Sequence, residues 1–242
     1  MFSSIIHVFH KSLHPSIILF CAMLSFLFCG VLEPSTVTAN TLEPLAIAEK
    51  LQTTYEEART LSADFKQTTA LQLSSRVKQG AGSMVFQKPG QMRWDYVEPD
   101  QQVLISDGKT ISMYFEKSKQ MIITAAKEFL QSDVTYSFFA GKGDVIKDFE
   151  ILEPNLPNSI TKGSYIIKLV PRKTHPQVAY MHAWITKQSF LINRLQIVDH
   201  FDTVTDLHFS NIQVNAEQYN NRKIDDDLFF FMPPADTEII EQ

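Results

Sequence analysis

Residues 82–99 read GSMVFQKPGQMRWDYVEP and decide the fold class. Two apolar-rich runs flank Pro89-Gly90, a dipeptide that turns the chain. Residues of like parity lie on one face of a pleated strand. Two pairs can therefore converge on one face, namely Met84 with Phe86 and Met92 with Trp94. The stretch predicts two neighbouring strands with a shared apolar face.

Similar strand patterns extend on both sides of this stretch. Leu61–Lys66 alternates apolar and polar residues with period two, and Asp107-Gly108 is a strong hairpin signal. The expected strands are 61–66, 82–88, 92–97, 103–105, 111–115, 121–124, 165–170, 179–186, 191–198, 205–214 and 228–231. Consecutive strands with short turns favour a mainly β (α+β) fold, whose antiparallel sheet of about ten or eleven strands curls or closes.

One helix is expected before the strands. Thr41 can cap a helix that begins near Leu42, with Pro44 inside its first turn. Apolar residues then recur at spacings of three and four, which defines one helical face. These residues are Leu45, Ala48, Leu51, Tyr55 and Ala58.

A second, short helix interrupts the strands. Ser132 or Asp133 can cap a helix over Val134–Phe138, and Gly141 and Gly143 stop it. A helix this short does not hold itself together alone, so we expect it to lean on the sheet.

The amino-terminal residues resemble a signal peptide. Met1–Ser16 has Lys11 as its only full positive charge, and Ile17–Leu32 is an almost unbroken apolar run. That run is shorter than the ~20 residues of a membrane span. Val37-Thr38-Ala39 supplies the small residues of a cleavage site, so we expect the mature chain to start at Asn40. An uncleaved membrane anchor is the alternative.

Cysteine content and charge narrow the function classes. Cys21 and Cys29 both lie in the expected signal peptide, and each follows a Phe, whereas lipoprotein processing requires a small residue there. A mature chain without thiols has no disulfide and no cysteine nucleophile. The net charge of −5 shows no basic excess, so we expect no nucleic-acid partner. Residues 40–242 suit a single domain with its own core.

Catalytic signatures are mostly missing from the sequence. It contains no G-x-S-x-G, H-E-x-x-H, Walker or G-x-G-x-x-G motif. Strand parity could bring four metal ligands together, namely His200, Asp202, Asp206 and His208, but a turn near Thr203 is the stronger interpretation. Three acids could be imagined in glycoside hydrolysis, Glu98, Asp100 and Asp107, but they lie at turn positions. We therefore predict no enzyme and no cofactor.

Aromatic and methionine residues indicate an apolar ligand. Aromatic residues make up 11% of the chain, and six methionines accompany them after the expected signal peptide, namely Met84, Met92, Met113, Met121, Met181 and Met232. Any one of these residues could simply fill a core, but methionine also adapts to irregular apolar ligands. A curled sheet with an apolar concave side under a short helix makes a lipid pocket.

The chain resembles the LolA family of lipoprotein carriers. The blocks that carry the resemblance are Leu61–Gln67, Gly82–Pro89, Arg93–Pro99, Ser106–Lys109 with Tyr114, and Phe231–Pro234. Together they extend the resemblance over essentially Leu42 to Ile240. It implies an unclosed antiparallel β-barrel with helices across its opening and an apolar cavity for acyl chains.

The resemblance also implies a site and partners. The expected cavity residues are Met84, Phe86, Met92, Trp94, Leu104 and Phe138. Only the resemblance indicates that Leu104 faces the cavity, because Val103–Ile105 is apolar at odd and even positions alike. The implied partners are an ATP-driven release complex of the inner membrane (LolCDE-like) and a lipid-anchored outer-membrane acceptor (LolB-like). We expect a monomeric carrier located in the periplasm.

One position departs from the family pattern. Better-known members carry Arg immediately before the proline of this block, and here the residue is Lys88. Lysine keeps the charge but loses the planar fork of donors. We expect Lys88 to gate the cavity by holding the last turn of the short helix, near Ala140 and Gly141. Met92 likewise stands where a bulky aromatic residue is familiar.

Two other functions remain as alternatives. A periplasmic lipid-binding sensor on a similar barrel would need a second domain, for which residues 40–242 leave no room. A lipid-ester hydrolase would need a nucleophile in the cavity.

Overall fold

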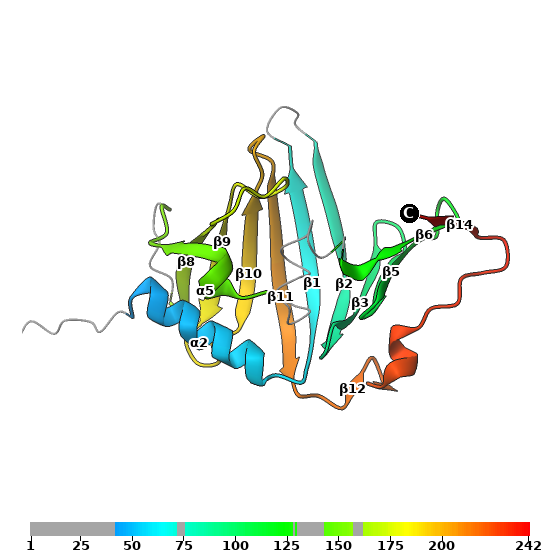
Figure 1. Ribbon diagram of the computed structural model, residues 1–242, viewed down its shortest axis with the longest axis horizontal. Helices are drawn as coiled ribbons and strands as arrows, with labels where there is room; N and C mark the ends of the chain where they lie inside the picture. Colours follow the sequence, from blue (N-terminus) through cyan, green and yellow to red (C-terminus); the bar gives the residue numbers. More distant parts are fainter. Residues whose placement is uncertain (1–41, 72–75, 128, 130–142, 157–161) are drawn as a thin grey trace, which may run out of the picture. The chain divides into compact units, whose positions relative to one another are not determined.

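A single open sheet dominates the computed structural model, which describes residues 42–71, 76–127, 129, 143–156 and 162–242 (Figure 1). The expected signal peptide and the expected helix over Val134–Phe138 lie outside these residues. The sheet contains twelve strands in the order β14-β6-β5-β4-β3-β2-β1-β11-β10-β9-β8-β7. Their bounds are β1 Thr60–Ala70, β2 Val77–Gln87, β3 Gln91–Glu98, β4 Gln102–Asp107, β5 Thr110–Phe115, β6 Gln120–Ala125, β7 Phe149–Leu152, β8 Ser164–Pro171, β9 Tyr180–Thr186, β10 Ile192–Val198, β11 Val204–Val214 and β14 Glu238–Glu241.

The sheet confirms the predicted mainly β, unclosed architecture. Strands β1 to β11 form an uninterrupted antiparallel array of eleven strands. Strand β14 then adds to β6 in parallel, with Glu238 opposite Gln120. Strands β14 and β7 end the order on opposite edges and are not paired with each other in the described part of the chain.

Two glycines explain how the central strands reach their register. Gly108 has φ +92°, which an L side chain rarely adopts, so the predicted Asp-Gly turn between β4 and β5 requires it. Gly82 lies at the irregularity between β2 and β3. A Cβ atom there would stand 1.9 Å from the backbone oxygen of Asp95. Only glycine allows this close approach of the two strands.

The first helix is shorter at its start than predicted. Helix α2 spans Pro44–Glu57, with Pro at its first turn and Glu43 at the N-cap. Thr41, the expected cap, is outside the described residues. Leu45 is 51% exposed, so its assignment to the buried face was wrong. It lies about 120° around the helix from buried Leu51.

The buried face of α2 consists of Ile47, Ala48, Leu51 and Tyr55. A one-turn helix, α5 Val145–Asp148, lies beside α2 and was not predicted. Its N-cap is Asp144, whose carboxylate accepts from the backbone N–H groups of Ile146 and Lys147.

The segment 228–231 is not the strand that the sequence predicted. Instead, Asp226–Phe229 forms the 3-10 helix η1. Leu228 and Phe229 are both buried, although they are consecutive, which a strand with one buried face does not allow. Two more unpredicted strands form a short hairpin, β12 Gln218–Tyr219 and β13 Arg222–Lys223.

These elements divide the interior into two apolar clusters. The larger one lies between α2, α5 and the concave face of the sheet. The smaller one lies on the opposite face, where the carboxyl-terminal segment covers β2 and β4 with Tyr219, Leu228 and Phe229 against Val85 and Ile105. The segment that contains β12, β13 and η1 therefore covers the outer face of β2, β3 and β4, whereas α2 packs on the concave face.

Candidate functional site

The concave face brings five of the six predicted cavity residues together. Met84, Trp94 and Leu104 are direct partners across β2, β3 and β4, and Phe86 pairs with Met92 beside them. All five are buried in the larger cluster. Phe138, the sixth, is outside the described residues. Leu104 faces this cluster, whereas Val103 and Ile105 face the other one.

Aromatic rings surround Trp94 on this face. Its ring centroid lies 4.8 Å from that of Phe65, 6.0 Å from Phe86, 6.4 Å from Phe209 and 6.5 Å from Tyr96. Phe65 and Phe209 were not among the predicted cavity residues. Period-two parity within β1 and β11 was the signal that could have found them.

A small cavity opens at one side of this cluster. Its volume is about 170 Å³, and it is lined by Tyr96, Gln102, Val103, Leu104, Met113, Tyr114, Phe115 and Phe129. A cavity of about 150 Å³ lined by apolar side chains takes up a molecule such as benzene. The cavity therefore has room for a segment of an acyl chain, and a whole chain requires the cluster to open.

Helix α2 packs on the apolar face beside β7 and β8 and is tied to the sheet. The Tyr55 hydroxyl accepts a hydrogen bond from the backbone N–H of Ile192 on β10, at 3.3 Å. Burial raises the pKa of Tyr55 well above its usual range. Gln52 of α2 also accepts from the backbone N–H of Val145, at 3.0 Å. Opening the apolar face at this end means breaking these contacts.

Lys88 holds the carboxyl-terminal end of α2. Its ammonium donates to the backbone carbonyls of Tyr55 and Glu56, the latter at 2.8 Å. Burial lowers the pKa of Lys88, while the charge of Glu56 opposes that shift. The last carbonyls of a helix are unpaired and carry its negative dipole end, so a cation there is favourable. The partner that we expected for Lys88, the turn near Ala140, is outside the described residues.

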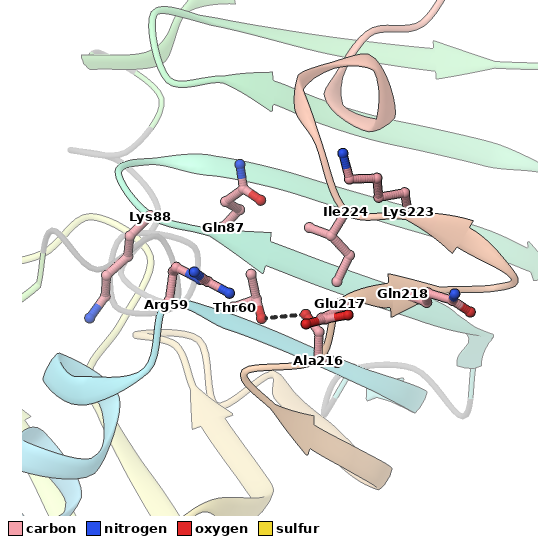
Figure 2. A pocket seen from close by; sticks show the side chains of 9 residues that line it. All are labelled: Arg59, Thr60, Gln87, Lys88, Ala216, Glu217, Gln218, Lys223 and Ile224. Carbon is pink, nitrogen blue, oxygen red and sulfur yellow. Dashed lines mark hydrogen bonds between the residues drawn. The ribbon is translucent and has the colours of Figure 1, made fainter.

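A larger hollow beside Lys88 is polar (Figure 2). Its volume is about 640 Å³, and it is lined by Arg59, Thr60, Gln87, Lys88, Ala216, Glu217, Gln218, Lys223 and Ile224. The Thr60 hydroxyl donates to the Ala216 carbonyl at 2.9 Å across its floor. Its size is typical of ligand sites, but its charged walls do not suit acyl chains.

The residues considered for metal binding form ordinary structural contacts. Asp206 accepts from the Arg194 guanidinium at 2.9 Å, and His200 donates to the His175 carbonyl. Asp202 has φ +57°, and Asp199 accepts a hydrogen bond from the backbone N–H of Thr203. Asp202 therefore lies in a turn, and not on the strand that carries Asp206. Within the described residues, no group of three or more His, Cys, Asp or Glu side chains could hold a metal ion.

The acids considered for glycoside hydrolysis lie at strand ends and in a connection: Glu98 ends β3, Asp107 ends β4, and Asp100 lies between these strands. Burial would raise the pKa of Asp107, but hydrogen bonds from the backbone N–H groups of Thr110 and Lys109 outweigh it and lower that pKa. Asp100 accepts from Lys117 on the surface, at 3.3 Å. Asp107 and Asp100 therefore make contacts that stabilise the chain reversals beside them.

An open antiparallel sheet with an apolar concave face under a helix defines a class of binding domains for apolar ligands. The family model for "Outer membrane lipoprotein carrier protein LolA" matches residues 56–232, and the chain belongs to this family. Within the described residues, no helix combines the length and the apolar character that crossing a membrane requires.

Individual relatives agree with this assignment. An outer-membrane lipoprotein carrier protein of Nitrosospira multiformis is 29% identical over 223 residues, covering 92% of this chain and 97% of that protein. Another from Nitrosomonas europaea is 27% identical, covering 79% and 87%. An uncharacterized conserved protein of Thermus thermophilus shares the fold, with a TM-score of 0.51 at 12% identity, covering 82% of this chain and 98% of that one.

Proposed function

We propose that this protein is a periplasmic carrier that binds the acyl chains of lipoproteins released from the inner membrane and delivers them to an outer-membrane acceptor. The observation that carries the proposal is the buried set Met84, Phe86, Met92, Trp94 and Leu104 on the concave face of an open sheet. The names of the relatives support the class of cargo. Membership of a carrier family also supports a role without catalysis.

A carrier of this kind needs partners, because moving acyl chains out of a membrane costs free energy. An acyl chain of about fifteen methylenes is held in a membrane by roughly 12 kcal/mol, at ~0.8 kcal/mol per CH₂. The chain carries no Walker motif in its sequence, so another protein must supply the energy. We therefore propose loading by an ATP-driven, LolCDE-like complex and unloading to a LolB-like acceptor with a more apolar cavity.

The proposal includes the processing of the chain. Residues 1–39 act as a cleaved signal peptide, and residues 40–242 form the single carrier domain. The length of the Ile17–Leu32 run and the Val37-Thr38-Ala39 site support this division.

Tryptophan fluorescence tests acyl binding directly. The chain has two tryptophans, and Trp184 lies on the other face of the sheet, 4.1 Å from the Arg194 guanidinium. In a Trp184→Phe variant, emission reports Trp94 alone. We expect its spectrum to shift when a sixteen-carbon acyl ligand is added. An unaltered spectrum at saturating ligand would contradict the assignment of Trp94 to the cavity.

We propose that Lys88 tunes release, because it stabilises the closed, empty carrier by holding α2. Closure competes with ligand, so a stable closed state lowers the apparent affinity. A cation at a helix end contributes about 0.3–1 kcal/mol when exposed and up to ~2 kcal/mol when partly buried. Lys88→Leu should therefore bind acyl ligand roughly two- to thirtyfold more tightly and transfer it more slowly.

Two variants control this experiment in a reconstituted transfer assay. Lys88→Arg should transfer as fast as wild type or faster, since its fork can engage more carbonyls. Lys223→Leu removes a lysine from the same polar hollow without touching α2, and should leave transfer unchanged. Equal transfer rates for wild type and Lys88→Leu would show that Lys88 has no gating role.

A further inference from the structure

The concave face changes from apolar to polar along its central strands. On β1 the inner residues continue from Phe65 to Gln67 and Thr69, and on β11 Leu207 is followed by Thr205, which pairs with Thr69. On β3 and β4, Trp94 and Leu104 are followed by the pair Tyr96 and Gln102. Because the strands are antiparallel, all these polar groups lie toward the Ala70 end of β1 and the Val77 end of β2. Helix α2 precedes the opposite end of β1, which begins at Thr60 (Figure 1).

Hydrogen bonds join the polar groups across three strands. The Tyr96 hydroxyl donates to Gln67 Oε1 at 3.0 Å, and Gln67 Nε2 donates to Thr69 Oγ1 at 3.5 Å. Thr69 and Thr205 share a hydroxyl hydrogen bond of 3.1 Å. The phenol reaches β1 by passing over β2, where Gly80 leaves room for it. A Cβ atom on Gly80 would approach the Tyr96 ring to 3.3 Å.

The acyl cavity meets this polar network. Tyr96 and Gln102 line the 170 Å³ cavity together with Leu104 and Met113. The side-chain amide of Gln102 has no hydrogen-bond partner among the described residues. An amide at the wall of an apolar cavity gains most from a ligand that brings a hydrogen-bond acceptor to it.

We propose that this polar end binds the carbonyl oxygens of the ester or amide groups that join the acyl chains to the cargo, with Gln102 as the direct donor and Tyr96 beside it. The inference rests on the proposed carrier function. The hydrocarbon tails then run past Trp94 toward α2, and the polypeptide of the cargo leaves near the Ala70 end of β1. The carrier thereby distinguishes acylated protein from plain hydrocarbon.

Two synthetic ligands test this selectivity. Both are peptides whose amino-terminal cysteine carries a glyceryl group with two sixteen-carbon chains, joined by esters in one ligand and by ethers in the other. The ether analogue keeps the tails and removes only the two ester carbonyl oxygens. We expect wild type to bind the ester ligand about fivefold more tightly, the effect of one net hydrogen bond.

Variants assign the preference to the polar end. Gln102→Leu should lose the preference while it binds the ether analogue as well as wild type does, which also shows that it is folded. Gln101→Leu, at the exposed neighbouring residue, should keep the preference. Equal binding of both ligands by wild type, or a preference that survives Gln102→Leu, would overturn the inference. If neither ligand binds wild type, the proposed carrier function fails, and the inference fails with it.

Discussion

The variant Gly82→Ala is expected to lower the free energy of unfolding by about 3 kcal/mol or more, or to prevent folding. Its Cβ would stand 1.9 Å from the Asp95 backbone oxygen, and backbone in the middle of a sheet cannot rotate away as a side chain can. Strands β2 and β3 would have to separate where they carry Met84 and Trp94. Urea unfolding followed by circular dichroism measures the loss.

Gly80→Ala is the matched control, two residues earlier on the same face of β2. Its Cβ would stand 3.3 Å from the ring of Tyr96, a side chain that can shift by a few tenths of an ångström, and 3.5 Å from the Glu98 backbone oxygen, an ordinary van der Waals contact. We expect the free energy of unfolding to fall by about 1 kcal/mol or less, at the low end of the range for overpacked sites. Equal losses for the two variants would contradict the close strand approach at Gly82.

Trp94→Ala is expected to cost about 3–5 kcal/mol, the range for truncating a large buried aromatic residue. Trp94 is 1% exposed and contacts aromatic rings from three other strands, among them Phe65 and Phe86. The removed indole leaves a hole at the centre of the concave face. The shift of the urea midpoint measures this loss of unfolding free energy, provided that the slope of that free energy against urea concentration is unchanged.

Phe201→Ala provides the comparison, because Phe201 is 77% exposed. Truncation of an exposed aromatic residue should change stability by no more than about 0.5 kcal/mol. A loss below about 1 kcal/mol for Trp94→Ala would mean that the concave face is loosely packed when empty, contrary to the burial described above.

Local periodicity predicted most of the sheet. The apolar-rich runs 92–97 and 111–115, which follow the turn signals Pro89-Gly90 and Asp107-Gly108, identified β3 and β5 almost to the residue. Strand β14 escaped prediction because its four residues are stabilised by parallel pairing with β6, a contact distant in sequence. The consecutive apolar residues Leu228 and Phe229 resembled a strand in the sequence. In the structure a 3-10 helix allows both side chains to be buried in the smaller apolar cluster, against Val85 and Ile105.

Strand parity predicted which side chains of the candidate site share a face of the sheet. It could not predict contacts between segments that are distant in the sequence. Parity placed Met84 with Phe86 and Met92 with Trp94, while Leu104 depended on family resemblance. The partner of Lys88 could not be predicted, because the Tyr55 carbonyl lies 33 residues earlier in the chain. No local pattern indicates which helix end a lysine will reach.

Mass spectrometry of the protein isolated gently from the periplasm tests the central claim most directly. We expect a chain that begins at Asn40 and carries a co-purified acylated lipoprotein or lipid, lost when the concave face is disrupted by Trp94→Ala. A membrane-bound chain that retains Met1, or a soluble chain that never carries an acyl ligand, would contradict the proposed carrier function.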